Sequence, residues 1–466
     1  MSSDHRRGHA MFRFPPPPPL SGFDRSFFFD TAVILLSITL MAVPRTARAI
    51  PAFAQQTGQP CAACHVGAFG PQLKQYGRDF KLNGYLASDG KNHGLPIAAS
   101  IQTSFTHTNA DQSPAAAPHF AANDNIALDQ LSLYYGGRIT SWLGTFAQVT
   151  YDGIGDQLAL DNTDLRIARD RDLFGEDLVW GVDANDNPTI SDLWNSTPAW
   201  GFPYNGSALA PAPMAATLID GGLGERVAGA GGYAMWKDLI YIETEVYRGL
   251  GYDVLNAIGN VPVAGTDKTR GLIPYWRAAL QHQSGRSYFE LGTYGLHASV
   301  LPGGTSIDGR TDDFTDAAAD ANYQFIFNPH SVVSDMISAH TTYIHEDANL
   351  SDSQALVGAT PGHGLETFRA DVSYSFAATY TPTVQYFQTS GTNDAAYWGT
   401  PNGSPNSSGM IAEIAYVPWG KPDSPMLWGN IRFAVQYVDY FRFDGQSRNA
   451  SGNNALYLSI WAAAHF

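Results

Sequence analysis

The sequence has little positive charge, little cysteine and almost no long apolar runs, and these scarcities exclude several classes of protein. Its 466 residues include 27 Lys and Arg against 43 Asp and Glu, giving a net charge of −16, and only 15% of residues are charged. Such an acidic chain is unsuited to nucleic acid, whose phosphates attract Lys and Arg. A helical membrane protein needs several stretches of about 20 apolar residues, which are missing here. With 44% hydrophobic residues, the chain is nevertheless rich enough in apolar side chains to fold.

The one long apolar run lies at the N-terminus and is typical of a secretory signal. Arginines precede the apolar stretch 31–43, and Ala47-Arg48-Ala49 has the small-x-small pattern of a cleavage site. A membrane anchor is disfavoured because Pro44 closes a stretch too short to cross about 30 Å of hydrocarbon. We therefore expect residues 1–49 to be a cleaved signal peptide, with the exported chain beginning at Ile50.

The two cysteines of the chain lie together in Cys61-Ala62-Ala63-Cys64-His65. A C-x-x-C-H run is the covalent attachment motif of c-type haem, in which both thiols bond the haem vinyl groups and the histidine coordinates the iron. A redox-active C-x-x-C is expected beside a βαβ unit, and a zinc site needs two more nearby Cys or His ligands. The sequence thus predicts one covalent haem c held by Cys61, Cys64 and His65, with a plain disulfide as the remaining alternative.

Apolar residues after this motif recur at helical spacing. Phe69, Leu73, Tyr76 and Phe80 form one stripe, and Gly84 is placed to end the helix. We expect this stripe to cover a haem face, although an ordinary core helix has the same pattern. Segment 50–96 is too short to build much of a core unless a cofactor or an enclosing structure supports it.

The second axial ligand of the iron is less clearly marked. Segment 50–96 contains no methionine, and His93 is the nearest histidine after His65. We predict His93 as the distal ligand, against an exposed loop histidine or an open iron position. A ligand from farther along the chain, such as Met235 or His297, is the other alternative.

From residue 97 onward the pattern has a period of two. Phe368, Val372 and Tyr374 share one parity, while Arg369 and Asp371 share the other, which is typical of a strand with one apolar face. Stretches rich in Gly, Asn, Asp and Pro, such as 185–213 and 391–408, separate the runs as loops. We count about sixteen strand-like runs, an even number that favours a closed barrel over a β-sandwich or a propeller. Their centres lie near residues 102, 133, 147, 166, 180, 231, 243, 278, 292, 322, 339, 373, 386, 414, 434 and 460.

The polar parity predicts a lumen, and the chain end predicts an outer membrane. Glu243, Glu245 and Asp371 fall on the polar parity, so we expect them to face the lumen, where they could attract Fe²⁺ or simply be solvated. Residues 456–466 alternate apolar and polar and end in Phe466. This ending resembles the terminal signature of bacterial outer-membrane barrels.

These features together resemble a known family. The signal peptide is followed by Gln56-Thr57-Gly58, the C-x-x-C-H motif, Phe80-Lys81-Leu82-Asn83-Gly84-Tyr85 and a barrel-like region ending in Phe. This order is similar to that of the outer-membrane monohaem cytochrome–porin fusions of iron-oxidising bacteria, with the haem segment as the most specific part. The resemblance implies a mainly β protein in which an α-helical haem c segment, 50–96, plugs an outer-membrane barrel of about 16 strands, 97–466. It also implies electron transfer from an extracellular donor such as Fe(II) to a periplasmic cytochrome.

Two other functions fit the same sequence. One is a diffusion porin whose haem segment serves only as a gate or a stabilising plug. The other is a haem peroxidase-like enzyme, which needs an open iron position and a distal acid or base. Both keep the barrel in contact with outer-membrane lipid, and neither involves nucleic acid.

Overall fold

The computed structural model describes residues 52–91, 94–260, 265–304, 308–425 and 429–465. The expected signal peptide (1–49), the predicted distal ligand His93 and the terminal Phe466 all lie outside these residues.

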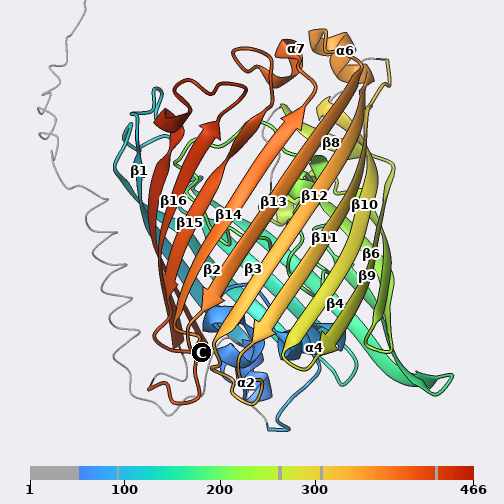
Figure 1. Ribbon diagram of the computed structural model, residues 1–466. Helices are drawn as coiled ribbons and strands as arrows, with labels where there is room; N and C mark the ends of the chain where they lie inside the picture. The colour runs from blue at the N-terminus through green and yellow to red at the C-terminus, as the bar shows by residue number, and fades with distance from the viewer. Residues whose placement is uncertain (1–51, 92–93, 261–264, 305–307, 426–428, 466) are drawn as a thin grey trace, which may run out of the picture. The chain divides into compact units, whose positions relative to one another are not determined.

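Antiparallel strands form a closed barrel with sixteen strand positions (Figure 1). Consecutive strands pair along the chain, except that β7 pairs with β9 instead of β8, and β1 closes the sheet by pairing with both β2 and β17. One of these positions is occupied by two strands, β8 and β9, which are separated by Gly271 and both pair with β10. The strands are β1 (Ile97–Thr108), β2 (Asn125–Arg138), β3 (Gly144–Asp152), β4 (Gln157–Leu173), β5 (Glu176–Asn185), β6 (Val227–Trp236), β7 (Ile240–Gly249), β8 (Gly265–Arg270), β9 (Leu272–Ser284), β10 (Ser287–Gly303), β11 (Asp312–Ile326), β12 (Met336–Leu350), β13 (Gly362–Ser375), β14 (Tyr380–Gly391), β15 (Ser407–Tyr416), β16 (Gly429–Arg442) and β17 (Ala455–His465).

The predicted strands agree closely with this barrel. All sixteen predicted centres fall inside strands, and the expected closed barrel is confirmed. The sequence did not indicate β8, whose residues Gly-Thr-Asp-Lys-Thr-Arg have no apolar parity.

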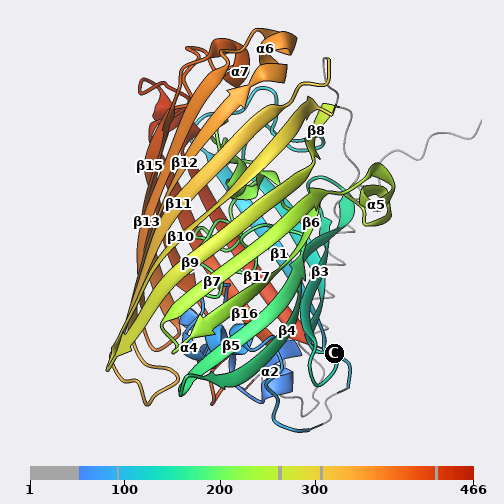
Figure 2. The same cartoon turned by 90° about the vertical axis from the view of Figure 1, so that its right-hand side faces the viewer.

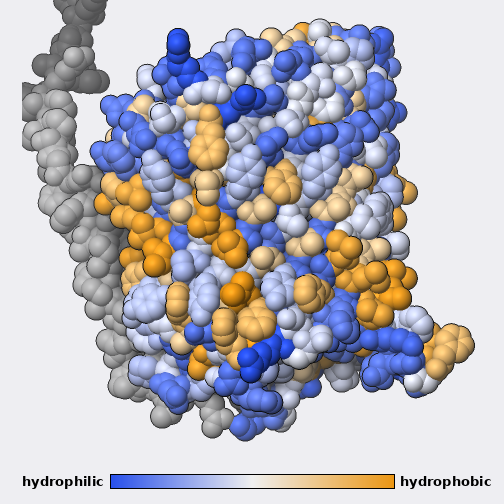
Figure 3. Space-filling view, in the orientation of Figure 1, coloured by the Kyte–Doolittle hydropathy of each residue, from blue (hydrophilic) through white to orange (hydrophobic). Residues whose placement is uncertain are grey.

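The barrel wall is apolar outside and polar inside. On β7, Ile242 and Val246 are 56% and 48% exposed, whereas Glu243 and Glu245 between them are buried. The same holds on β13, where Val372 faces outward and Asp371 faces inward. Apolar residues gather on the flank of the barrel and hydrophilic residues cover the rim at the top of Figure 3. An apolar outer surface with a polar interior is the pattern of a barrel that spans a lipid bilayer. Among the described residues, no helix has the length and apolar character required to cross a membrane.

The two ends of the barrel differ in the length of their connections. At one end, tight turns such as 174–175 and 285–286 join the strands. At the other end, longer loops carry three short helices and a 3₁₀ turn (Figure 2). These are α5 (Tyr252–Ala257), α6 (Ser351–Val357), α7 (Ala395–Trp398) and η3 (Ala450–Asn453). In outer-membrane barrels the short turns face the periplasm and the long loops face outward.

The N-terminal helices occupy the short-turn end of the barrel (Figures 1 and 2). They are α2 (Ala52–Thr57), α3 (Cys61–Cys64), η1 (Val66–Ala68) and α4 (Gln75–Leu82). The predicted helix ends where expected, since Gly84 follows the cap with a φ of 66°. Its predicted start was wrong: Phe69 and Leu73 precede α4, because Phe69 is extended, with φ −161° and ψ 151°, and Gly70 has a φ of 95°. We call residues 52–91 the plug segment.

A second segment enters the barrel from the side of the long loops. Residues 186–226, which we call the inward loop, connect β5 to β6 and include the short helical turn η2 (Leu218–Gly222). Gln385 on β14 donates to the carbonyl of Phe202 at 2.7 Å, and Gln436 on β16 donates to that of Asn205 at 3.1 Å. The inward loop therefore reaches the wall opposite its own strands.

Candidate functional site

The C-x-x-C-H motif forms one helical turn against the short-turn end of the barrel. Cys61 and Cys64 are the first and last residues of α3, and the His65 amide donates to the Cys61 carbonyl at 2.9 Å. Cys61 packs in an apolar cluster with Ala68, Ala378 and Val417. The latter two belong to the turns that follow β13 and β15. No disulfide joins these two cysteines, which are the only cysteines of the chain.

The pKa values of the two thiols and of the imidazole distinguish between the possible roles of the motif. Burial raises the pKa of the Cys61 thiol to about 11 and that of Cys64 to about 12. Redox-active C-x-x-C pairs have a lowered thiol pKa, so this environment does not suit such a role. Burial also lowers the pKa of His65 to about 4, which leaves the imidazole neutral, the form that binds metal. Its Nδ1 atom is buried without a hydrogen-bond partner. Two adjacent thiols and a neutral histidine are the donor set that c-type haem requires, so the residues fit this group.

Backbone contacts fix the motif in place. The Ala62 amide donates to the Gly420 carbonyl at 2.9 Å, and Lys74 Nζ donates to the Ala62 and Val332 carbonyls, each at 2.9 Å. A Cβ atom at Gly77 of α4 would lie 2.7 Å from the Cys64 carbonyl oxygen. Glycine at this position therefore allows α4 to pack directly on α3.

Helix α4 is buried on several faces and carries two buried cations. Arg78 donates to Gln324 Oε1 at 2.9 Å and its guanidinium lies 3.8 Å from the centre of the Tyr288 ring. Lys81 Nζ donates to the carbonyls of Ile190 and Asp192 in the inward loop, each at 2.6 Å. The plug segment is thus bonded to both the barrel wall and the inward loop.

Two of the alternative iron ligands, Met235 and His297, lie among the described residues. Met235 lies on the inner wall and packs with Leu82 of α4, in a different cluster from Cys61. His297 is exposed on the outward face of β10, where its Nδ1 lies 2.9 Å from Thr315 Oγ1. His297 therefore points away from the plug segment, whereas Met235 points toward it.

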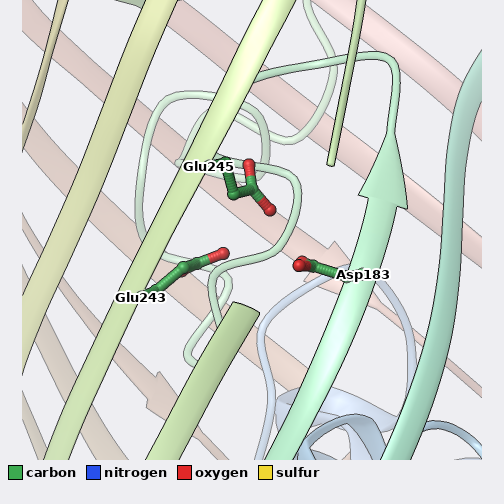
Figure 4. Close-up of side chains that lie close together, drawn as sticks. All are labelled: Asp183, Glu243 and Glu245. Atoms are coloured by element: carbon green, nitrogen blue, oxygen red, sulfur yellow. The ribbon is translucent and has the colours of Figure 1, made fainter. Parts of the chain in front are cut away.

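Three carboxylates on the inner wall of the barrel lie close together. Asp183 on β5 and Glu243 and Glu245 on β7 each offer an oxygen, and these oxygens lie within 4.8 Å of one another. Figure 4 shows the three side chains pointing toward one another. They are 1%, 1% and 2% exposed, respectively. We call them the carboxylate triad.

A glycine on the intervening strand allows the triad to form. Gly231 on β6 stands opposite both Asp183 and Glu245 in the strand register. A Cβ atom at this position would lie 2.6 Å from Glu245 Cγ. The sequence predicted that Glu243 and Glu245 face the lumen, but it did not point to Asp183 on β5.

The triad is incompletely hydrogen-bonded. Tyr241 donates to Glu243 at 3.1 Å, and Asn185 Nδ2 donates to Glu245 at 2.9 Å. Neither Asp183 oxygen has a hydrogen-bond partner, and the same is true of Glu243 Oε1.

The nearest guanidinium is committed to another carboxylate. Arg166 Nε bonds Asp164 at 2.9 Å, whereas its NH2 atom lies 3.9 Å from Asp183. Tyr85 of the plug segment donates to the same Asp164 at 2.6 Å. The Arg166–Asp164 pair therefore lies between the triad and Tyr85 of the plug segment.

A second buried group of carboxylates surrounds Arg277. The guanidinium lies 2.9 Å from Asp320, 3.3 Å from Glu290 and 3.3 Å from Asp192. We call these four residues the Arg277 group. Asp371, the third predicted lumen acid, faces inward as expected but pairs with His340 at 3.0 Å, apart from both groups.

Comparisons with known proteins give structural neighbours only. No family model matches the sequence, and no curated protein matches it. Similar solved structures include an OmpF–daunomycin complex of Salmonella typhi, with 11% identity and a TM-score of 0.44, covering 79% of this chain and 97% of that one. An anion-selective porin from Comamonas acidovorans has 10% identity and a TM-score of 0.44, covering 80% and 99%. A loop-deletion mutant of OmpT, an outer membrane protein of Vibrio cholerae, has 10% identity and a TM-score of 0.41, covering 80% and 98%.

Proposed function

We propose that this chain is an outer-membrane electron-transfer protein that carries one covalent haem c on its plug segment. In this proposal it takes single electrons from an extracellular reductant, for which Fe(II) is our candidate, and passes them to a periplasmic cytochrome. The observation that carries the proposal is the position of Cys61, Cys64 and His65 on a segment held inside the short-turn end of the barrel.

The barrel supports the membrane part of the proposal. Its outward residues are apolar, its inward residues are polar, and its turns are short at one end and long at the other. These are the features of an outer-membrane barrel. The plug end is then the periplasmic end, so a soluble acceptor could approach it from the periplasm.

The plug segment supports the redox part. Bound haem would supply a one-electron Fe(III)/Fe(II) couple. The thiols of Cys61 and Cys64 would tether it and His65 would be its proximal ligand. Lys74 and Gly77 hold the helix that bears these residues against α4, and contacts with barrel turns hold the whole segment in position.

Haem staining after denaturing electrophoresis tests the cofactor. The full chain, expressed with a cytochrome c maturation system, should stain at its own molecular mass. Cys61→Ser and Cys64→Ser should reduce or abolish the stain, and His65→Ala should leave haem attached with altered ligation and spectrum. His297→Ala, which changes an outward histidine, is the matched control and should leave stain and spectrum unchanged. A folded wild-type chain without stain would remove the cofactor and the electron-transfer function together.

A diffusion porin with a plug is the second candidate, and the barrel architecture itself favours it. In vesicles that enclose a cytochrome, the electron-transfer protein should reduce the enclosed cytochrome when Fe(II) is added outside. A diffusion porin should instead pass small solutes and give equal conductance with and without Cys61→Ser. Reduction of the enclosed cytochrome by the Cys61→Ser protein at the wild-type rate would show that Fe(II) leaks through a pore.

A further inference from the structure

The carboxylate triad lacks the partners that buried carboxylates normally have. Burying a charge is costly unless it is paired and hydrogen-bonded. Asp183 is 1% exposed, yet neither of its oxygens accepts a hydrogen bond, and Glu243 also has one oxygen without a partner. Arg166 does not satisfy them, because its closest approach to Asp183 is 3.9 Å while it bonds Asp164.

One further buried oxygen near the triad lacks a hydrogen-bond partner. The Tyr275 hydroxyl on β9 is an electrostatic neighbour of Glu243 and Glu245, and Tyr275 stands opposite Glu245 in the register. The Ser191 side chain of the inward loop neighbours Glu243. Tyr275 is 2% exposed and its hydroxyl oxygen has no hydrogen-bond partner among the described residues. Buried oxygens from β5, β7, β9 and the inward loop thus lie in the same part of the barrel interior.

We infer that Asp183, Glu243 and Glu245 form a binding site for one divalent cation of the class that prefers oxygen ligands. Two oxygens bound to one ion at about 2.0–2.6 Å lie at most about 4–5 Å apart. The 4.8 Å limit on the triad oxygens therefore allows them to share an ion with small side-chain movements. A cation would partner the Asp183 oxygens, which accept no hydrogen bond and come no closer than 3.9 Å to Arg166.

The donor set narrows the class of ion. Carboxylates with hydroxyls or water suit Mg²⁺ and Mn²⁺, and Fe²⁺ binds a given oxygen site more tightly than Mn²⁺. Ca²⁺ needs six to eight ligands, which favours a smaller ion in a site built from three carboxylates. The sulfur ligands of softer metals are missing, since both cysteines of the chain lie in the motif of α3. The site therefore takes an ion of the Mg²⁺, Mn²⁺ and Fe²⁺ type.

Side-chain contacts connect the proposed cation site to the plug segment. Arg166 approaches Asp183 of the triad to 3.9 Å and bonds Asp164 at 2.9 Å, and Asp164 accepts a hydrogen bond from Tyr85 of the plug segment at 2.6 Å. A cation bound there is connected through these contacts to the segment that bears the C-x-x-C-H motif. The site is made by the barrel and the inward loop and does not require attached haem.

Mn²⁺ binding to the full-length protein in detergent tests the site. After treatment with chelator and dialysis into about 0.15 M salt, which screens exposed charges, Mn²⁺ is titrated and the free aqueous ion is measured by electron paramagnetic resonance. The wild-type chain should bind one Mn²⁺ per chain tightly, and Fe²⁺ and Mg²⁺ should displace it. Asp183→Asn and Glu243→Gln should each weaken this binding at least tenfold.

Matched variants separate the site from general acidity. Asp371→Asn removes another inward acid that is paired with His340, and it should change Mn²⁺ affinity less than twofold. Cys61→Ser should bind Mn²⁺ like the wild type, so failure of haem attachment and failure of this site are distinguishable. Glu245→Gln is the second cluster variant if Asp183→Asn does not fold, with folding checked by the heat-dependent shift of the barrel on gels. Equal Mn²⁺ binding by wild-type and folded cluster variants, or no tight Mn²⁺ in the wild type, would overturn the proposal.

Discussion

Two groups of buried carboxylates lie on the same inner wall, and they differ in how their charges are satisfied. In the Arg277 group, one guanidinium lies within 3.3 Å of Asp192, Glu290 and Asp320. Asp192 also accepts from the backbone amides of Ser196 and Thr197. In the carboxylate triad, Asp183 accepts no hydrogen bond, although Arg166 is nearby. The Arg277 group therefore holds the wall and inward loop together, whereas the triad leaves ligand atoms available.

The comparison also shows what distinguishes a structural charge cluster from a binding site. Both groups contain more carboxylates than guanidinium groups, so formal charge does not separate them. Hydrogen bonding does, because a buried charge without a partner costs more than one bonded within the fold. Four changes test this distinction, beginning with the largest expected effect.

Arg277→Met should give the greatest loss of stability. Removing the guanidinium leaves three carboxylates buried without their common partner, and breaking a buried ion pair in this way costs about 3–5 kcal/mol. Urea unfolding in detergent, followed by tryptophan fluorescence, measures the loss. Arg277→Lys keeps the charge and should lose less. A loss below about 1 kcal/mol for Arg277→Met would show that this group is not structural.

Tyr85→Phe should weaken the link between the plug segment and the wall next to the triad. The hydroxyl donates to the buried Asp164 carboxylate at 2.6 Å, and hydrogen bonds to charged groups contribute about 1.5–3 kcal/mol. We expect a stability loss of that size together with faster proteolysis of residues 52–91. Tyr76→Phe is the control, since Tyr76 is 39% exposed. Equal behaviour of the two variants would contradict an anchoring role for Tyr85.

Asp183→Asn should raise stability in the presence of a chelator. The substitution removes a buried negative charge that has no hydrogen-bond partner, so we expect a gain of about 1–2 kcal/mol. Asp320→Asn should have the opposite sign, because it breaks a guanidinium pair at 2.9 Å. Melting of both variants after metal removal measures the contrast. A loss of stability in Asp183→Asn similar to that in Asp320→Asn would erase the difference between the groups.

Lys81 has charged neighbours in both groups and should make the stability of the fold depend on pH. Burial is the main cause that lowers the pKa of Lys81 to about 7, and its charged neighbours include Asp164, Asp192 and Glu243. Between pH 7 and the ordinary lysine pKa of about 10.4, the unfolded chain binds more protons than the folded chain. Stability should therefore rise with pH from 7 upward, by at most about 1 kcal/mol between pH 7 and 8. Lys81→Met should flatten this slope in urea unfolding, and an unchanged slope would exclude Lys81 as its source.

The strands could be predicted from the sequence because each has to separate lipid from lumen. Residues 368–376 alternate apolar and polar side chains, and the structure places these on the outer and inner faces of β13. Strand β8 escaped prediction because its polar residues carry no such alternation. The start of α4 was wrong for a local reason, since apolar spacing continues through Phe69 and Leu73 while the extended backbone of Phe69 and the positive φ of Gly70 keep these residues out of the helix.

The site residues differ in how far they could be predicted. Cys61, Cys64 and His65 stand out as a contiguous motif, and their role in binding haem stays a prediction. Glu243 and Glu245 were predicted to face the lumen, and the structure confirms that orientation. Their contact with Asp183 depends on the β5–β6–β7 register and on Gly231 between them, which are long-range features. The path of the inward loop and the pairing of β7 with β9 are equally long-range, so Ser191 and Tyr275 could not be connected with the triad from the sequence.

Reduction of the attached haem by Fe(II) is the direct test of electron transfer by this chain. Oxidised full-length protein in detergent is mixed with Fe(II) under anaerobic conditions, and visible absorption follows the change to the reduced haem spectrum. The account predicts reduction in the wild type, with one Fe(II) consumed for each haem. Haem-bearing protein that stays oxidised with excess Fe(II) at both acidic and neutral pH would contradict iron oxidation, and the barrel with its plug segment would still stand.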